Sequence, residues 1–130
     1  MRIVKFRGKR VDNGEWVYGS LIEDKYIVGI VIDWEEHYFN TEYWWRVIPE
    51  TVGQFTGLLD KNGKEIYEGD IVREHANDYT PIYQNGIYMA YNVDKINDPY
   101  VSTQFNVIWR NDCEVIGNIH DNPELMGETK

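Results

Sequence analysis

The sequence predicts a mainly β protein, and three observations lead to this fold class. Aromatic residues make up 15% of the 130 residues, with five Trp and ten Tyr, and such residues are favoured in strands. Short apolar and alternating segments dominate, whereas helical periodicity is scarce. Asn-Gly pairs, which are typical of hairpin turns, occur at residues 13–14, 62–63 and 85–86. We therefore expect one domain over residues 1–130, a small, partly open barrel or sandwich of antiparallel hairpins.

The N-terminal part of the chain predicts four strands. Residues 2–7 and 15–22 should pair across the first Asn-Gly turn, which as a type I′ turn needs positive φ at both central residues. Residues 26–32 are almost continuously apolar, which is typical of a central or covered strand. Residues 44–48 should form the next strand and end at Pro49, because proline has no amide hydrogen for the ladder.

The middle of the chain predicts a second hairpin. Residues 50–55 are compatible with one helical turn. The strands on either side of Asn62 and Gly63 should pair, and we expect positive φ at both of these residues. Glu68-Gly69-Asp70 is then a tight turn into the next strand.

Residues 73–104 form an irregular region, interpreted as a long excursion from the domain. Residues 82–91 within it carry the third Asn-Gly pair and should form a ribbon of their own. An isolated ribbon is marginal in water, and Tyr and Met are enriched at interfaces. We therefore expect this ribbon either to pack on a second copy of the chain or to cover its own domain.

The C-terminal part predicts two strands and a helical turn. The strands are expected at residues 105–109 and 114–119, joined by a polar turn. Residues 121–126 should form a short C-terminal helical turn, because Asp and Asn favour the cap and Pro the first turn.

The charge of the chain argues against nucleic acid as a partner. The net charge is −9 and the pI is about 4.7, so the surface as a whole repels a phosphate backbone. The one basic cluster is expected to be a solvated strand face. It consists of Arg2, Lys5, Arg7, Lys9 and Arg10.

The single cysteine, Cys113, predicts an inert thiol. One cysteine forms no internal disulfide, and no Cys/His spacing suggests zinc. The neighbouring charges of Asp112 and Glu114 should raise the thiol pKa. No apolar stretch has the length of a membrane span and no signal peptide is recognisable, so we expect a reducing cytoplasm.

The candidate reactive groups predict no catalytic residue, no metal site and no cofactor. Residues 33–37 are the densest set of possible metal ligands, but neighbours along a strand or turn point apart. Residues 60–65 resemble the start of a calcium loop, yet its fifth position is Lys64 and its twelfth Ile71. His75 and the pair His120-Asp121 have no nucleophile beside them.

The aromatic side chains leave one binding alternative open. Exposed on a barrel face they would stack on single-stranded bases, although such side chains more often pack in the core. Only Arg46 and Arg110 are close to them in sequence. The candidate aromatics are Trp16, Tyr18, Trp34, Tyr43, Trp44, Trp45 and Trp109.

Three blocks of the sequence resemble the YopX family of phage and prophage proteins. The first is Phe6-Arg7-Gly8-Lys9 with Trp16-Val17-Tyr18-Gly19, the second is residues 49–72, and the third is residues 114–125. Together they reach both ends of the chain. Phe55, Leu59 and His120 depart from the residues common in the family at these positions.

The resemblance implies a phage or prophage origin, a mostly β structure and self-assembly, and it implies no chemistry. We expect a non-enzymatic accessory protein in the cytoplasm of a bacterial host. It should act by protein contact, as a homo-oligomer or with a host or phage protein. The alternative is a small β-barrel that binds single-stranded nucleic acid.

Overall fold

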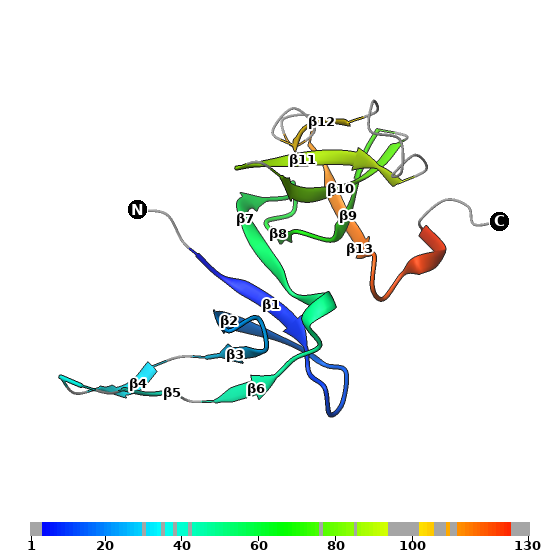
Figure 1. The fold of residues 1–130 in the computed structure, drawn as a ribbon. Helices are drawn as coiled ribbons and strands as arrows, with labels where there is room; N and C mark the ends of the chain where they lie inside the picture. Colours follow the sequence, from blue (N-terminus) through cyan, green and yellow to red (C-terminus); the bar gives the residue numbers. More distant parts are fainter. Residues whose placement is uncertain are drawn as a thin grey trace. The chain divides into compact units, whose positions relative to one another are not determined.

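The computed structural model consists of two compact units, Met1–Phe55 and Thr56–Lys130, each described here by itself (Figure 1). It describes residues 4–29, 31–34, 36–37, 39–41, 43–75, 77–84, 86–93, 102–105, 109 and 112–125. Antiparallel strands dominate both units, which confirms the mainly β prediction. The single domain expected over residues 1–130 stays a prediction.

The first unit is built on an antiparallel sheet with strand order β6-β3-β2-β1. Its strands are β1 (Phe6–Lys9), β2 (Trp16–Ile22), β3 (Tyr26–Val28) and β6 (Trp44–Arg46). A β-bridge between Arg10 and Val47 joins the ends of β1 and β6, so the sheet curls into a partly open barrel. The first residues of β7 (Gly53–Leu59) pair with β1.

The inner side of this sheet forms the core of the first unit. Ile27 and Val47 are fully buried there. A Cβ at Gly8 would lie 3.0 Å from the Cβ of Val47, so a larger residue here would require Val47 to shift by a few tenths of an ångström. The Tyr43 hydroxyl donates a hydrogen bond of 2.9 Å to the carbonyl of Tyr18 and closes the same side.

The turns of the first unit differ from the expected type I′ geometry. Gly14 has a φ of 74°, but Asn13 is not in the positive-φ region; its side chain accepts a hydrogen bond from the Glu15 amide instead. Positive φ at two successive residues occurs between β2 and β3, at Glu23 (54°) and Asp24 (59°). The expectation of a type I′ turn at Asn13 is therefore wrong. The two successive residues with positive φ are instead Glu23 and Asp24.

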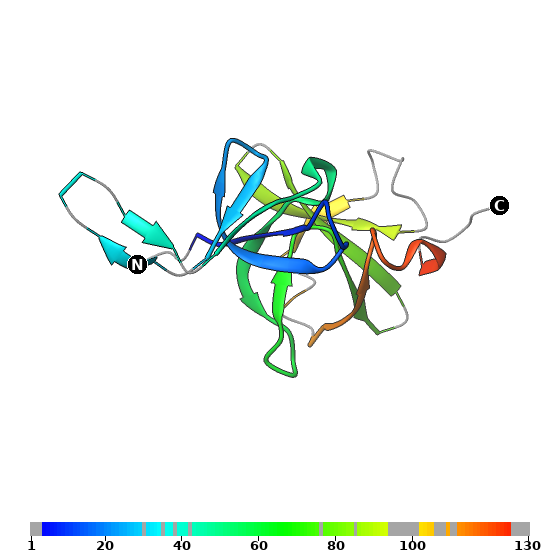
Figure 2. The same ribbon diagram turned by 90° about the horizontal axis from the view of Figure 1, so that it is seen from below.

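The long apolar strand expected at residues 26–32 is divided. β3 ends at Val28, and β4 (Val31–Trp34) pairs with β5 (Phe39–Thr41) in a separate two-stranded sheet. This ribbon extends away from the other strands of the first unit (Figure 2). The central position of the first half is confirmed, because β3 lies between β2 and β6. The helical turn expected at residues 50–55 is a 3₁₀ turn at Pro49–Thr51, and residues 53–55 belong to β7 instead. The strand expected at residues 44–48 ends at Arg46, before Pro49.

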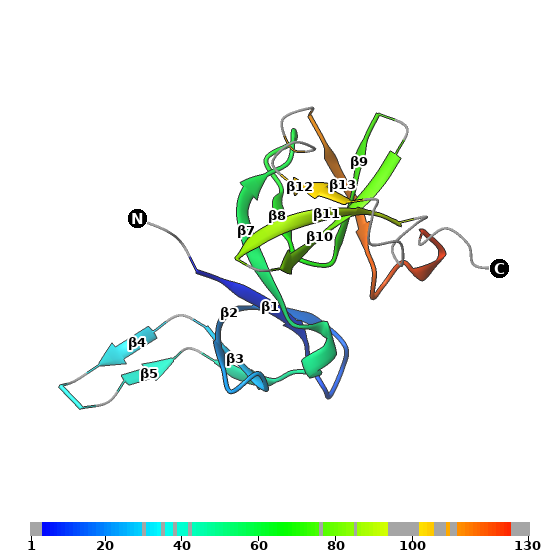
Figure 3. The same cartoon turned by 45° about the horizontal axis from the view of Figure 1, so that its top comes forward.

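The second unit contains a five-stranded antiparallel sheet of order β12-β11-β10-β9-β13 (Figure 3). β7 continues into this unit, where β8 pairs with it. The strands are β8 (Glu65–Tyr67), β9 (Asp70–Glu74), β10 (Asn77–Gln84), β11 (Ile87–Asn92), β12 (Ser102–Gln104) and β13 (Glu114–Asn118).

The hairpin expected at residues 82–91 is confirmed, but its position corrects the sequence interpretation. β10 pairs with β9 as well as with β11, so it is the central strand of the sheet rather than part of a ribbon that leaves the domain. Gly86 has the positive φ that the turn requires, at 89°, and residue 85 lies outside the described residues. The C-terminal helical turn is confirmed as a 3₁₀ turn at Pro123–Leu125.

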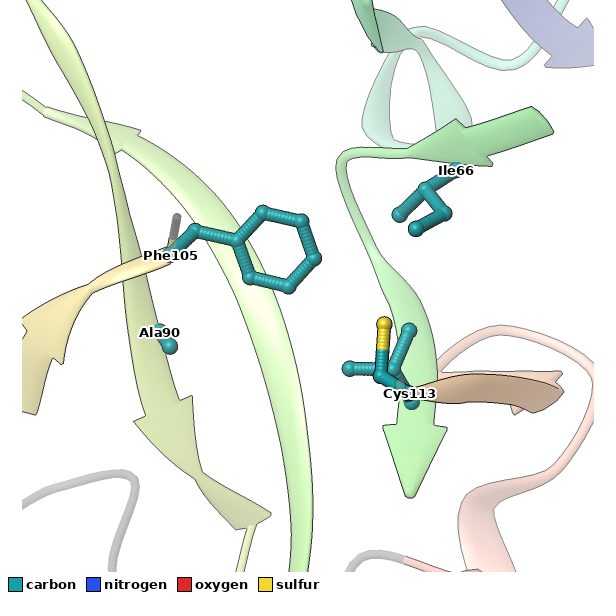
Figure 4. Packing of buried hydrophobic residues seen from close by; sticks show 5 residues of the cluster. Ile66, Ala90, Phe105 and Cys113 are labelled. Carbon is teal, nitrogen blue, oxygen red and sulfur yellow. The ribbon is translucent and has the colours of Figure 1, made fainter. Parts of the chain in front are cut away.

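A buried cluster holds the second unit together. It consists of Ile66, Val72, Ala90, Phe105 and Cys113, and Figure 4 shows the Phe105 ring pointing toward the strands that carry Ile66 and Cys113. The strand expected at residues 105–109 is wrong at both ends, because Phe105 and Trp109 have helical backbone; residues 106–108 lie outside the described residues. Phe105 itself lies in the core with helical backbone, where an extended residue was expected.

Candidate binding face on the N-terminal sheet

The most distinctive sequence block, residues 49–72, stabilises its own turns. Asp60 Oδ1 accepts hydrogen bonds from the amides of Asn62 (2.8 Å) and Lys64 (2.9 Å), and Oδ2 accepts one from the Val115 amide (2.9 Å). Burial by itself raises the pKa of Asp60, but these three hydrogen bonds outweigh it and the pKa is lowered overall. One carboxylate oxygen binds the hairpin turn and the other binds β13, so the likeness to a calcium loop has a structural explanation.

The φ angles of this hairpin correct another expectation. Gly63 has a φ of 85°, but Asn62 is not in the positive-φ region. The Gly63 amide donates to the Asp60 carbonyl (2.9 Å), and the Asp60 amide donates to the Lys64 carbonyl (2.8 Å). In this turn Gly63 alone has a left-handed backbone, and glycine commonly occupies this position in a bulged hairpin.

Cys113 is a buried thiol of low reactivity. It is fully buried in the cluster of the second unit. Burial raises its pKa to about 11, and the nearby charges of Asp60, Asp112 and Glu74 add to the shift. The expected direction is confirmed, although burial and Asp60 are larger causes than the sequence neighbours.

The histidine and acidic candidates have local roles. His75 is exposed, and its Nε2 lies 3.5 Å from a carboxylate oxygen of Glu74. The amides of His120 and Asp121 both donate to the side chain of Asn118, which makes this pair part of a turn.

The acidic segment 33–37 yields one ion-pair contact. His37 Nε2 lies 3.7 Å from Glu36 Oε1, and both side chains are exposed. Glu35 and the side chains of Asp33 and Trp34 lie outside the described residues. In the part of the chain that the structure describes, no three His, Cys, Asp or Glu residues are grouped as metal ligands would be.

One face of the N-terminal sheet gathers aromatic and basic side chains, and we call it the outer face. Paired residues of antiparallel strands point to the same side of a sheet. The registers place Lys9 with Trp16, Arg7 with Tyr18, Ser20 with Val28 and Trp44, and Ile22 with Tyr26 and Arg46. Lys5 joins this side two residues before Arg7.

Cations of the outer face lie against aromatic rings. The guanidinium carbon of Arg7 lies 4.6 Å from the ring centroid of Trp16, and Lys9 Nζ lies 5.7 Å from the same centroid. Lys5 Nζ lies 5.7 Å from the Phe55 centroid. Such distances are within the range of cation–π attraction, so the basic cluster is more than the solvated strand face that the sequence suggested.

Arg10 and Arg2 do not belong to this face. The Arg10 guanidinium lies 3.5 Å from the Trp45 ring centroid on the other side of the sheet, and it pairs with Asp12 at 2.6 Å. Arg2 lies outside the described residues.

The half of the outer face on β2, β3 and β6 is exposed and apolar. Trp44 is 63% exposed, Tyr18 43% and Ile22 42%. Tyr26 and Trp44 meet edge to face, with ring centroids 5.8 Å apart. This half of the face contains a shallow groove of about 270 Å³. The groove is lined by Ile22, Tyr26, Val28 and Trp44.

The electrostatics of the outer face differ from those of the chain as a whole. No Asp or Glu occurs in β1, β2, β3 or β6. Arg46 and Lys25, both exposed beside the groove, make no ion pair with any described residue. The acidic residues nearest to the groove in sequence are Glu23 and Asp24, in the turn that follows Ile22, and Glu42, two residues before Trp44.

The other aromatic candidates are placed elsewhere. Tyr43 and Trp45 lie on the inner side of the sheet, 6.2 Å apart between ring centroids. Trp109 belongs to the second unit, where its Nε1 donates a hydrogen bond of 2.6 Å to the carbonyl of Leu59. The side chain of Trp34 and residue Arg110 lie outside the described residues.

The described strands define a mainly β protein built of antiparallel sheets. A family model described as "YopX protein" matches residues 5–127. The chain belongs to the YopX family. It is similar to a crystal structure of protein EF1440 from Enterococcus faecalis, with 25% sequence identity, coverage of 97% of this chain and 99% of that chain, and a TM-score of 0.66. The comparison with curated proteins found no match.

The structure also bears on the membrane expectation. Among the residues that it describes, no helix is long and apolar enough to cross a membrane.

Sequence reasoning recognised the members of the outer face but not their arrangement. Trp16, Tyr18 and Trp44 were candidates for stacking, and Lys5, Arg7 and Lys9 were treated separately as a basic cluster. The signal that could have joined them is alternation, because basic residues occupy positions 5, 7 and 9 and aromatic residues positions 16 and 18. Arg46 was noted only as a neighbour in sequence.

Proposed function

We propose that the protein is a non-enzymatic accessory protein that acts by binding a macromolecular partner through the outer face. The observation that carries the proposal is the exposure of Trp44 at 63% beside a groove that is mostly apolar. Trp, Tyr and Arg are the residues most enriched in binding hot spots. The face combines all three at Trp44, Tyr26 and Arg46.

The remaining candidate groups support a binding role over a catalytic one. The carboxylate of Asp60 and the thiol of Cys113 are engaged in a turn and in a buried cluster. Their arrangement stabilises the second unit and presents no nucleophile to a substrate.

The proposal extends to the setting of the protein. We propose that it is a phage or prophage product that works in the cytoplasm of a bacterial host with a phage or host partner, and its membership of the YopX family supports this. Self-association is a second part of the proposal. Tyr83 and Ile87, at the end of the β10–β11 hairpin, are 43% and 45% exposed and provide apolar surface for a contact between copies.

A pull-down from host cells tests the role of the outer face. Tagged wild-type protein and the variant Trp44→Ala are compared by mass spectrometry, with Leu59→Ala as the control, since Leu59 is also exposed (47%) but belongs to the second unit. We expect at least one specific partner to be lost with Trp44→Ala and kept with Leu59→Ala. Identical partner sets for all three proteins would refute the proposal.

Light scattering coupled to size exclusion tests self-association. We expect a mass above one chain for the wild type and a lower mass for Tyr83→Asp combined with Ile87→Asp. Deleting residues 79–97 is unsuitable as a test, because it removes the central strand of the second sheet. A monomer mass for the wild type at micromolar concentration would show that the hairpin does not join copies.

A further inference from the structure

We infer that the ligand of the outer face is single-stranded nucleic acid, with bases stacked on Trp44 and Tyr18 and phosphates held by the surrounding Lys and Arg side chains. This inference rests on the proposed function, because it names the partner of the same face. It uses the placement of side chains, which the composition of the chain does not reveal.

The aromatic side chains are exposed as stacking on bases requires. Trp44 on β6 and Tyr18 on β2 are separated by two strand spacings, which is ~10 Å. Both have more than two-fifths of their surface in solvent. Base–aromatic stacking tolerates any sequence, since every base has a π-face. The groove between Ile22, Tyr26 and Val28 can accept the apolar face of a base or sugar.

The cations of the face provide contacts for phosphates. Arg46 lies beside Tyr26 in the register, and Lys9 and Lys5 lie toward the other edge. The guanidinium of Arg46 is exposed and has no ion pair with a described residue. Proteins that bind single strands without sequence preference combine such cations with aromatic platforms.

The acidic net charge does not oppose this assignment directly, because it is unevenly distributed. Residues 1–55 contain seven Lys or Arg and nine Asp or Glu, whereas residues 56–130 contain six and thirteen. Most of the net charge of −9 therefore belongs to the second unit. The four strands of the face carry Lys and Arg residues and no acidic residue, and the acidic residues flank them in sequence at Glu15, Glu23, Asp24 and Glu42.

Single strands fit this face better than a duplex. Reading a duplex requires a helix, ribbon or arm that enters a groove. A sheet face with exposed rings instead needs unpaired bases that can leave their own stack. With about three phosphates neutralised, the slope of log affinity against log salt should be about −2.

Fluorescence anisotropy with labelled oligonucleotides tests the inference. A strand of about 20 thymidines, the corresponding RNA and a duplex are titrated with full-length protein at about 50 and 200 mM salt. We expect saturable binding of the single strands at the lower salt, at least tenfold tighter than binding of the duplex. No single-strand binding at the lower salt, or equal binding of the duplex, would overturn the inference.

Matched variants locate the site. We expect Trp44→Ala and Tyr18→Ala to weaken binding about tenfold each, and Arg46→Glu to weaken it mainly at the lower salt. Leu59→Ala is the control, because Leu59 is also exposed (47%) but lies in the second unit and belongs to neither proposed contact surface. Trp44→Phe keeps an aromatic ring and should keep most of the affinity, which separates loss of stacking from loss of folding. Equal affinity for all variants would refute the assignment to this face.

The two proposals can fail separately. If the oligonucleotides do not bind but Trp44→Ala loses a protein in the pull-down, the proposed function stands with a protein as the ligand, and the nucleic-acid inference is wrong. If neither assay responds to Trp44→Ala, the proposed function itself is wrong.

Discussion

Replacing Asp60 should destabilise the second unit selectively. The carboxylate accepts three backbone hydrogen bonds, from Asn62, Lys64 and Val115, at 2.8–2.9 Å. A hydrogen bond to a charged group contributes about 1.5–3 kcal/mol, and less where water can replace the lost partner. Asn62 and Lys64 are exposed, whereas the Val115 residue is half-buried. The Val115 bond should therefore dominate the loss.

The expected magnitude follows from these environments. Asp60→Ala removes all three acceptors, and we expect a loss of about 2–4 kcal/mol in the free energy of unfolding. Asp60→Asn has one uncharged oxygen and one NH₂ group. With the oxygen toward the amides of Asn62 and Lys64, the NH₂ group faces the Val115 amide, so the free energy of unfolding should fall by about 1–3 kcal/mol. Asp12→Asn is the control, because Asp12 is an exposed turn residue, and its variant should unfold like the wild type.

The effect should also depend on pH with a defined sign. The pKa of Asp60 is lowered in the folded state, so its carboxylate stabilises the protein above its ordinary pKa of 3.8. This contribution is lost as the pH falls through the lowered pKa of the folded state. The difference in stability between wild type and Asp60→Asn should therefore shrink in strong acid.

Urea denaturation combined with hydrogen exchange measures this prediction. Exchange read by mass spectrometry reports each unit separately, through peptides around Ile27 in the first unit and Val72 in the second. We expect faster exchange near Val72 and no change near Ile27. An unchanged urea midpoint for Asp60→Ala, or a stability difference that persists undiminished in strong acid, would refute the role of the charged hydrogen bonds.

Three further outcomes are expected. Cys113 should resist a thiol reagent at about pH 8 in the folded protein and react at once in denaturant, because its thiol is buried and its pKa is raised to about 11; rapid reaction of the folded protein would contradict this. Gly19→Ala should lower the free energy of unfolding by about 2–4 kcal/mol, because the added Cβ would clash with the Val28 carbonyl oxygen. A melting temperature equal to that of the wild type would show that β2 and β3 can move apart at little cost in free energy. Gly63→Val should cost about 1–3 kcal/mol because of the φ of 85°, whereas Gly63→Asn should cost less; equal stability of the two variants would argue against a left-handed residue.

The hairpins could be predicted from the sequence because their signals are local. Glycines 14, 63 and 86 all have positive φ in turns between paired strands, as the Asn-Gly pairs indicated. The expected turn type was wrong at Asn13 and Asn62. In the first turn the Asn13 side chain accepts a hydrogen bond from the Glu15 amide, and in the second the Asp60 side chain accepts one from the Asn62 amide, which favours another turn geometry. The turn at Glu23 and Asp24 was missed, because it has no glycine and is imposed by the pairing of β2 with β3.

The interruption of the long apolar segment was equally invisible in the sequence. Residues 26–32 have the composition of one strand, yet Gly29 separates β3 from the β4–β5 ribbon. A Cβ at Gly29 would lie 2.4 Å from the Tyr43 ring. The glycine is needed for a contact with a residue fourteen positions away in the chain, and composition carries no signal for such a contact.

The sequence by itself determined the strand-rich fold class, the hairpin positions and the family, because turn chemistry and alternation act over a few residues. Only the tertiary structure decided which side chains share a surface. Lys9 meets Trp16 and Arg46 lies beside Tyr26 through the register of four strands, and a shift of one residue would turn each of them to the other side. Register depends on the burial of Ile27 and Val47 and on the Arg10–Val47 bridge. These are contacts between distant parts of the chain, so the aromatic and basic face emerges only when the sheet is assembled.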